Sequence, residues 1–255
     1  MSQNKIKVVV LAAGYATRLY PLTENFPKPL LKISGSPMIE HILERLRPVE
    51  AIDEVFVVTN HKFAGQFADW AKGYSYRATI TVVDDGTDTN ENRLGAIGDL
   101  AFTFKKHHVG AQDVIVVAGD NLFDFDITAF LTIAKSKRPY PVIAGYDVKD
   151  RELAKKYGIL EVDGAGKVTR FLEKPSEPPT TLASCGLYWL PAETRSLLDR
   201  YLSDGHNADQ PGHYMRWLAE TYGLYAAQLE GCWYDIGDLE SYKNADALFA
   251  SKNKV

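Results

Sequence analysis

The sequence predicts an α/β fold, a three-layer Rossmann-like arrangement with a mainly parallel mixed sheet and an inserted antiparallel ribbon. Short apolar runs alternate with amphipathic helical segments through the first half of the 255-residue chain. This alternation is typical of a doubly wound sheet whose strands are buried on both faces. In the second half, two apolar runs flank Asp-Gly-Ala-Gly at 163–166, which indicates a β-hairpin. We therefore expect ligands to bind beyond the carboxyl ends of the core strands.

The first half of the chain is expected to supply parallel strands and the helices that connect them. Its apolar runs predict strands at 8–11, 55–59 and 80–83. Ser36 is expected to cap the first helix, with Pro37 at its first helical position, because both residue types favour a helix start. A second amphipathic helix is expected at 63–72. The polar segment 84–98 interrupts the alternation and predicts a loop that leads into a further helix.

The second half is expected to extend the sheet and to carry the ribbon. Strands are predicted at 114–118, 142–146, 158–162, 167–172 and 183–190. A charged helical turn is expected within 147–158, and helices are expected at 193–201, at 211–222 and from Leu239. An antiparallel ribbon added to a parallel sheet is expected to form one wall of a cleft.

Composition restricts the class of protein. A hydrophobic fraction of 45% and a length of 255 residues suit one α/β domain with one sizeable core. The net charge of −4 argues against a nucleic-acid partner. Cys185 and Cys232 lack metal-ligand spacing and are expected to be small buried hydrophobes. Because apolar runs stay shorter than the roughly 18 residues of a membrane span, and the first residues do not resemble a signal peptide, we expect no membrane partner and a cytoplasmic location.

The segment that follows the first predicted strand has the features of a polyphosphate site. Leu11, Ala12, Ala13 and Gly14 end the strand in small residues that allow a ligand to approach the backbone closely. Arg18 and Lys28 follow, on a stretch whose prolines disfavour a regular helix. Such cations offset the negative charge that develops during phosphoryl chemistry. An ordinary strand-to-helix loop is the alternative.

This loop differs from two other glycine-rich loops. A Walker loop requires a second glycine five residues after Gly14, where this chain has Leu19. A dinucleotide-binding loop requires glycine at the positions of Ala16 and Leu19. The spacing therefore argues against a P-loop and against a nicotinamide oxidoreductase.

The stretch 11–31, LAAGYATRLYPLTENFPKPLL, resembles the signature of the sugar-1-phosphate nucleotidylyltransferases, which include glucose-1-phosphate thymidylyl- and uridylyltransferases. It departs from that signature at Ala16, where the family usually has glycine, and close phosphate approach then requires a negative φ at this residue. The resemblance implies transfer of a nucleotidyl group from an NTP to a sugar-1-phosphate, with Mg²⁺ as cofactor. It also implies a single domain over 1–255, the short form without a β-helix domain. Its nucleotide-binding half would be about 1–122 and its sugar-phosphate-binding half about 123–255.

A carboxylate follows the strand at 114–118. By itself, Asp120 is either a turn residue or a Mg²⁺ ligand. Gly-Asp-Asn at 119–121 matches the family, which implies that Asp120 binds the metal and that Asn121 lies near the sugar. Trp-Tyr-Asp-Ile-Gly at 233–237 resembles the family's Trp-x-Asp-x-Gly, which implies that Asp235 is the second metal ligand.

The ribbon carries two motifs that resemble the family's sugar-phosphate site. In Tyr-Gly-Ile-Leu-Glu at 157–161, Gly158 is implied to let the sugar approach. In Glu-Lys-Pro at 173–175, Glu173 is implied to accept sugar hydroxyls and Lys174 to contact the phosphate. The strand at 183–190 has Cys185 where the family has threonine, which would remove one hydroxyl from the sugar pocket.

For the nucleotide, the resemblance implies binding by the opening loop and by the segment 84–98. The opening-loop residues are Leu11, Ala12, Ala13, Gly14 and Thr17. Leu-Gly-Ala-Ile-Gly at 94–98 is a shortened form of the family's base-binding motif, with the backbone of Gly95 and the side chains of Asn92 and Arg93 as the groups expected to read the base. Arg18 is expected to contact the leaving pyrophosphate, and Lys28 the α-phosphate or the transition state.

Several alternatives stay open at the level of sequence. The same chemistry would serve CTP with phosphocholine, or GTP with mannose or heptose phosphate. A non-catalytic nucleotide-sugar sensor is a further alternative, although both predicted metal carboxylates and both opening cations are present. The polar loop 204–212 is a candidate substrate cover. A homo-oligomer is neither required nor excluded.

Overall fold

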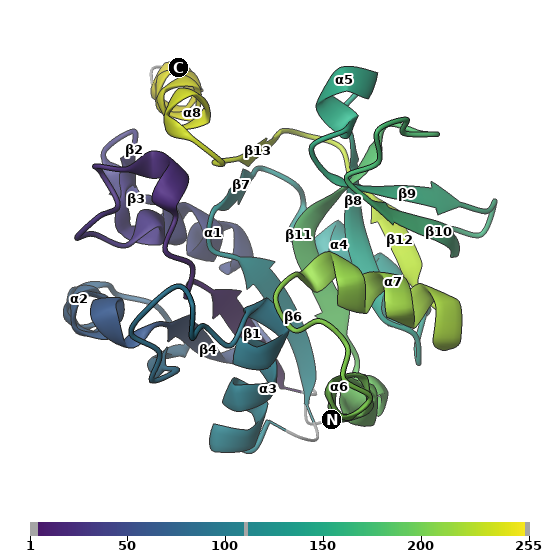
Figure 1. The fold of residues 1–255 in the computed structure, drawn as a ribbon, viewed down its shortest axis with the longest axis horizontal. Coiled ribbons are helices and arrows are strands. Elements are labelled where there is room, and N and C mark those ends of the chain that lie inside the picture. The colour runs from purple at the N-terminus through teal and green to yellow at the C-terminus, as the bar shows by residue number, and fades with distance from the viewer. Residues whose placement is uncertain (1–4, 110–111, 253–255) are drawn as a thin grey trace.

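The computed structural model describes residues 5–109 and 112–252. Within these residues the chain forms a nine-stranded mixed sheet in the order β10-β9-β11-β6-β1-β4-β5, with β8 paired to β11 and β12 paired to β8 (Figure 1). The strands of the sheet are β1 Ile6–Leu11, β4 Ile52–Thr59, β5 Thr79–Asp84, β6 Asp113–Ala118, β8 Val142–Asp147, β9 Gly158–Val162, β10 Val168–Glu173, β11 Leu182–Leu190 and β12 Tyr225–Gln228. The predicted Rossmann-like fold is confirmed.

Strands β6, β1, β4 and β5 are parallel neighbours and form the first half of the sheet. Val9 of β1 lies between Phe56 of β4 and Val116 of β6. Because side chains alternate along a strand, Val9 packs into one hydrophobic cluster, while Val8 and Val10 pack into another on the opposite face. Burial of both faces explains why these strands are continuous apolar runs in the sequence.

Helices cover both faces of the sheet. The cluster that contains Val8 includes side chains of α1 (Met38–Leu46), α2 (His61–Gly73) and α4 (Ile127–Ser136). The cluster that contains Val9 includes side chains of α3 (Ala96–Lys106), α6 (Arg195–Ser203) and α7 (Pro211–Thr221). The result is three layers, as predicted. None of the helices in the described part of the chain has the length and apolarity needed to cross a membrane.

The second half of the sheet contains the predicted ribbon. β9 and β10 pair antiparallel, with Glu173 opposite Gly158, and they flank the expected turn. In that turn the carboxylate of Asp163 accepts hydrogen bonds from the backbone N–H groups of Ala165 and Lys167. β11 runs antiparallel to β6 and to β9, so it joins the ribbon to the parallel strands. The short helix α5 (Arg151–Ala154) precedes β9 (Figure 1).

Two short strands beyond the sheet bring distant parts of the chain together. β7 (Asn121–Phe123) pairs antiparallel with β13 (Trp233–Asp235), with Asn121 opposite Asp235. The C-terminal helix α8 (Leu239–Lys252) follows β13 and packs near β2 (Lys32–Ile33). There the hydroxyl of Tyr242 donates a hydrogen bond to the backbone carbonyl of Lys32. The chain therefore closes on its own opening segment.

The predicted start of the first helix is wrong. Ser36 and Pro37 form strand β3 (Ser36–Pro37), which pairs antiparallel with β2, and α1 begins at Met38 with Pro37 as its N-cap residue. The reason is a tight turn: Ser34 and Gly35 between the two strands both have positive φ, which is typical of a two-residue hairpin. The hairpin uses the residues that would otherwise have capped the helix.

Helix α4 and strand β12 were not predicted from the sequence. The start of α4 does carry a capping signal, because the carboxylate of Asp126 accepts hydrogen bonds from the N–H groups of Thr128 and Ala129. β12 is only four residues long, YAAQ, and its place beside β8 is set by tertiary packing.

Candidate active site

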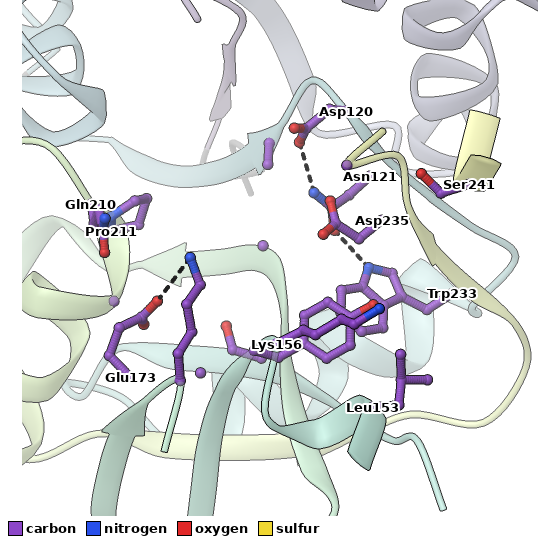
Figure 2. Close-up of a pocket in the computed structure, with 18 of the residues that line it drawn as sticks. Asp120, Asn121, Leu153, Lys156, Glu173, Gln210, Pro211, Trp233, Asp235 and Ser241 are labelled. Atoms are coloured by element: carbon purple, nitrogen blue, oxygen red, sulfur yellow. Dashed lines mark hydrogen bonds and ion pairs between the residues drawn. The ribbon is translucent and has the colours of Figure 1, made fainter. Parts of the chain in front are cut away.

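A cleft of about 730 Å³ opens beyond the carboxyl ends of the core strands, between the first half of the sheet and the ribbon. Seven of the residues predicted to form the site line it: Arg18, Asp120, Asn121, Gly158, Glu173, Lys174 and Asp235. Figure 2 shows Asp120, Asn121 and Asp235 on one side and Glu173 with Gln210 and Pro211 on another. The fold thus brings together motifs that are far apart in the sequence.

Lys28 forms an ion pair with Asp120. Its Nζ lies 2.7 Å from Oδ2 of Asp120, and the lysine is only 7% exposed. Burial alone would raise the pKa of Asp120, but the Lys28 ammonium and the amide of Asn121 outweigh this effect and hold the pKa below its usual value. A buried cation is therefore already in place beside the carboxylate.

Asp235 lies close to Asp120 because of the β7–β13 pairing. The backbone N–H of Ile236 donates to the carbonyl oxygen of Asp120 at 3.2 Å. Burial, together with the negative charge of Asp120, raises the pKa of Asp235 to about 6, while Lys28 and Arg18 act in the opposite direction. The site therefore contains two neighbouring carboxylates with different pKa values, a lowered one at Asp120 and a raised one at Asp235.

Asn121 lines the cleft and also forms two hydrogen bonds that connect neighbouring elements. Its Nδ2 donates to Oδ1 of Asp120 at 2.8 Å, and its Oδ1 accepts from the indole Nε1 of Trp233 at 2.6 Å (Figure 2). Trp233 also packs edge-on against Tyr157. Asn121 therefore connects the first carboxylate to the strand that carries the second.

The two carboxylates fit a Mg²⁺ ion. Mg²⁺ in phosphoryl-transfer sites is commonly held by one or two carboxylates, with phosphate oxygens and waters completing its shell. In residues 5–109 and 112–252 no group of three or more His, Cys, Asp or Glu side chains is arranged to hold a metal ion. The two carboxylates would therefore share the ion with phosphate oxygens and waters. Burial, and then repulsion by Asp120, raise the pKa of Asp235, and a bound cation would relieve that repulsion.

Arg18 lies near Asp235 and Gly237. It belongs to the 3₁₀ turn Thr17–Leu19, and its guanidinium nitrogens lie 3.8 and 3.9 Å from the position that a Cβ on Gly237 would take. That same position is 3.8 Å from Oδ2 of Asp235. The exposed guanidinium is thus available to an anionic ligand beside the carboxylates.

The ribbon wall of the cleft is closely packed around Glu173. A Cβ on Gly158 would lie 2.6 Å from the ring of Phe171 and 3.2 Å from Oε2 of Glu173, so this position requires glycine. Nζ of Lys174 lies 3.8 Å from Oε1 of Glu173, and the backbone N–H of Lys174 donates to the carbonyl of Tyr157. The wall presents one carboxylate and one ammonium to the cleft.

Comparison with known proteins decides the family. A model of the nucleotidyl transferase family matches residues 7–252, nearly the whole chain. The chain belongs to the nucleotidyl transferase family.

Curated relatives of this nucleotidyl transferase include sugar-phosphate enzymes. It is 30% identical to a UTP–glucose-1-phosphate uridylyltransferase from Synechocystis over 94% of this chain and 62% of that protein. It is 29% identical to mannose-1-phosphate guanylyltransferase 1 of Arabidopsis thaliana over 93% of this chain and 63% of that protein. The chain thus spans somewhat less than two thirds of the length of these relatives.

A solved structure supports the fold. A UDP-glucose pyrophosphorylase complexed with UDP-glucose superposes with a TM-score of 0.81 and 22% sequence identity, over 97% of this chain and 99% of that chain. At this identity the likeness concerns the fold alone. It agrees with the sheet and the helical layers described above.

The nucleotidyl transferase departs from expectation at Ala16. This residue has φ 47° and ψ 44°, the left-handed conformation, so the negative φ that would compensate for the missing glycine is not present. The carbonyl of Ala16 accepts hydrogen bonds from the hydroxyl of Thr23 and from the N–H of Leu19. These bonds hold a backbone conformation that an L-residue adopts only with strain.

The predicted nucleotide-binding residues of the opening loop lie outside the lining of the cleft in the described structure, four of them at the end of β1 and Thr17 in the 3₁₀ turn that follows. The carbonyl of Leu11 accepts from the N–H of Gly119, the N–H of Ala12 donates to Val58, and the carbonyl of Ala13 accepts from the buried side chain of Asn60. These contacts fix the loop against the neighbouring strand ends. The assignment of Leu11, Ala12, Ala13, Gly14 and Thr17 to the nucleotide stays a prediction.

The residues expected to read the base, Asn92, Arg93 and Gly95, also lie outside that lining, and their role stays a prediction. The side chain of Asn92 accepts a hydrogen bond from the N–H of Thr89, within its own loop. Gly95 packs against the backbone of Ala208 and Asp209, where an added Cβ would lie 2.5 Å from Cα of Asp209. The glycine is therefore needed for chain packing as well.

The expectation that Cys185 lies at the sugar pocket is wrong, whereas its expected burial is confirmed. The side chain is fully buried in the hydrophobic cluster that contains Val8, and its neighbours Ser184 and Gly186 line the cleft instead. Burial raises the pKa of its thiol well above the usual range. Residues alternate along β11, so a one-residue offset exchanges the core side for the cleft side. Neither Cys185 nor Cys232 forms a disulfide, and Cys232 is only partly buried, unlike the small buried hydrophobe that was expected.

Sequence reasoning missed several residues of the cleft. Lys156 lines it, immediately before the Tyr-Gly motif, and Gln210, Pro211 and Gly212 line it from the start of α7. A lysine adjacent to a recognised motif was an available signal for Lys156. Residues 210–212 end the polar loop 204–212, which is a candidate substrate cover from the sequence, and the packing of α7 against β10 brings them to the cleft.

Proposed function

We propose that this nucleotidyl transferase transfers a nucleotidyl group from an NTP to a sugar-1-phosphate and releases pyrophosphate. The observation that carries the proposal is the ion pair of the buried Lys28 with the partly exposed Asp120, beside Asp235. Both carboxylates line the same cleft as Glu173 and Lys174. The names of the relatives support the class of acceptor. The base and the sugar are left to experiment.

In the proposed reaction an oxygen of the sugar phosphate attacks the α-phosphorus of the NTP. A bond from this oxygen to phosphorus forms while the bond from the α-phosphorus to the bridging oxygen breaks, and pyrophosphate leaves with that electron pair. Both reactants are anions, so positioning and charge neutralisation are the main requirements, and no protein nucleophile is needed.

The chain's own cations have distinct places in this scheme. Lys28 is buried against Asp120 and suits the α-phosphate, where charge accumulates as the new bond forms. Arg18 is more exposed and carries a planar set of donors, which suits the leaving pyrophosphate. Lys174, beside Glu173 on the ribbon, suits the phosphate of the sugar.

We also propose Mg²⁺ as the cofactor, held by Asp120 and Asp235. A bound Mg²⁺ would supply charge neutralisation at the phosphate oxygens. Asn121 holds Asp120 in orientation through one hydrogen bond and is itself held by Trp233. A cytoplasmic location and a homo-oligomer stay predictions.

The test is a pyrophosphate-release assay across ATP, GTP, CTP, UTP and dTTP. Each nucleotide is tested with Mg²⁺ alone and with glucose-, mannose- and heptose-1-phosphate or phosphocholine. We expect release with at least one pair, its loss on chelation by EDTA, and its recovery when Mg²⁺ is restored. Release with CTP and phosphocholine alone would replace the sugar acceptor. Binding of a nucleotide sugar without release for any pair would indicate a sensor and overturn the proposal.

A further inference from the structure

Residues 207–212, here called the bridging segment, contact two regions assigned to different substrates. At one end the backbone of Ala208 and Asp209 packs on Gly95 in the loop 84–98. At the other end Gln210, Pro211 and Gly212 line the cleft. Figure 2 shows Gln210 and Pro211 facing the cleft on the side of Glu173. The segment is thus a physical connection between the predicted nucleotide side and the acceptor side.

The first contact is made by the backbone. Helix α3 begins after Gly95 without a side-chain cap, so its first N–H groups need other acceptors. The N–H of Ala96 donates to the carbonyl of Asp209 at 3.1 Å, and the N–H of Ile97 donates to that of Ala208 at 2.9 Å. The bridging segment therefore serves as the cap of the helix that follows the predicted base-binding loop.

An ion pair fixes the orientation of this contact. Nε and Nη2 of Arg93 donate to the two carboxylate oxygens of Asp209 at 2.8 and 2.9 Å, and Nη1 donates to the carbonyl of Asn90 at 2.6 Å. Two parallel hydrogen bonds from a planar guanidinium set angle as well as distance. Both side chains are partly exposed, at 38% and 40%, so the pair lies at a rim. It connects residues 116 positions apart in the sequence.

The second contact reaches the acceptor wall. A Cβ on Gly212 would overlap Oε2 of Glu173, so the backbone at the start of α7 touches that carboxylate directly. Any displacement of the bridging segment must therefore move Glu173 or open a gap beside it. Glu173 in turn lies beside Lys174, and both line the cleft.

We infer that Arg93 and Asp209 are positioning residues for the acceptor, acting through the bridging segment on Glu173. The inference rests on the proposed function, because it assigns Glu173 to the acceptor. Loosening the pair weakens acceptor binding and leaves the chemical step intact, since Asp120 and Asp235 line another part of the cleft and Lys28 is paired with Asp120. The intact Arg93–Asp209 pair also couples the binding of the two substrates, because a nucleotide that orders the loop 84–98 also orders the acceptor wall.

The experiment measures kcat and both KM values for Arg93→Ala, Asp209→Ala, the double variant and the charge-exchanged pair Arg93→Asp/Asp209→Arg. Arg216→Ala is the matched control, because it removes an exposed Arg–Glu pair from helix α7, which follows the bridging segment, without touching the cleft. A rim ion pair of good geometry corresponds to a change of about threefold to fivefold. We expect KM for the acceptor to rise by this factor in each single variant, with kcat changed by less than about twofold.

The double variant is expected to match the single variants, and the charge-exchanged pair to recover part of the loss. Arg93→Lys, which keeps the charge but not the planar set of donors, is expected to lie between wild type and Arg93→Ala. Additive losses in the double variant, or an acceptor KM in Arg93→Ala equal to that of Arg216→Ala, would overturn the inference. If Arg93→Ala unfolds, the acceptor KM of Arg93→Lys is compared with that of wild type instead, and equal values would overturn the inference.

A binding measurement separates this inference from the proposed function. Calorimetry with glucose-1-phosphate, in the presence and absence of UTP and with Mg²⁺ replaced by Ca²⁺ to slow turnover, gives the coupling between the two ligands. We expect UTP to tighten acceptor binding in wild type and to do so less in Arg93→Ala. Turnover in wild type with unchanged coupling in Arg93→Ala would reject the inference alone. Absence of both turnover and binding for every pair in the assay above would reject both proposals.

Discussion

Nζ of Lys28 and Oδ2 of Asp120 lie 2.7 Å apart although 92 residues separate them in the sequence. Lys28 follows Pro27 at the start of the 3₁₀ turn Lys28–Leu30, and Asp120 follows strand β6. The pair places a permanent counter-charge beside a carboxylate before any ligand binds. It is the point at which the cationic opening segment and the carboxylate motifs become one site.

Removal of Lys28 is expected to lower turnover strongly. Lys28→Ala deletes a preorganised cation, and such groups typically contribute about 10²–10³ in rate, so we expect at least that loss in pyrophosphate release. The same scale is expected for Arg18→Ala. The control is Lys7→Ala. Lys7 lies on β1, away from the cleft, and pairs with Asp53 and Glu54. Turnover near that of wild type in a folded Lys28→Ala protein would exclude the assigned role.

Replacement of Ala16 by glycine is expected to stabilise the protein. The left-handed conformation of Ala16 costs an L-residue about 1–2 kcal/mol, and the extra chain entropy of glycine offsets part of the gain. We expect a net gain of about 0.5–1 kcal/mol in the free energy of unfolding, measured by urea denaturation. Ala68→Gly, within helix α2, is the control and should destabilise by a similar amount. A loss of stability in Ala16→Gly would mean that the Ala16 Cβ contributes packing that outweighs the strain.

The free energy of unfolding is expected to depend on pH through Asp99. Burial, and then the neighbouring Asp85, raise the pKa of Asp99 to about 8. The folded state therefore holds a proton that the unfolded state releases above about pH 4, and the free energy of unfolding decreases as pH rises from there toward 8. Asp99→Asn removes this dependence, because the amide stays neutral and can still donate a hydrogen bond.

The measurement for Asp99 is urea unfolding of both proteins at about pH 5 and about pH 8. We expect Asp99→Asn to gain stability relative to wild type as pH rises. Asp69→Asn, at an exposed position of α2 paired with Lys72, is the control and should show no such trend. A constant difference between Asp99→Asn and wild type across this range would contradict the raised pKa.

Gly158→Ala is expected to impair the acceptor side selectively. The added Cβ would meet the ring of Phe171 at 2.6 Å and the carboxylate of Glu173 at 3.2 Å, so the ribbon wall must shift. We expect KM for the acceptor to rise by about tenfold or more, with a smaller change in KM for the NTP. Gly164→Ala, in the turn of the same ribbon with open space around it, is the control. An equal rise in KM for the acceptor and for the NTP would mean that Gly158 supports the fold as a whole and not the acceptor site.

Much of the architecture could be predicted because each local signal agrees with the fold. The apolar runs of β1, β4 and β6 are buried on both faces, and the Asp-Gly-Ala-Gly turn forms the expected hairpin. The start of α1 was misjudged because the same residues, Ser36 and Pro37, suit both a cap and a hairpin strand. Local propensity cannot choose between two such uses; the pairing with β2 does.

For the site, the residue types that take part can be recognised along the chain: the opening cations, two carboxylates in recognisable motifs, and the glycines of the ribbon. How these residues combine depends on tertiary contacts. The β7–β13 pairing sets Asp235 beside Asp120, the alternation of β11 turns Cys185 into the core, and the backbone at Ala16 takes a left-handed conformation. The packing of α7 brings Gln210 and Gly212 to the acceptor wall. These relations depend on register and on contacts between distant segments, which a pattern along one chain does not encode.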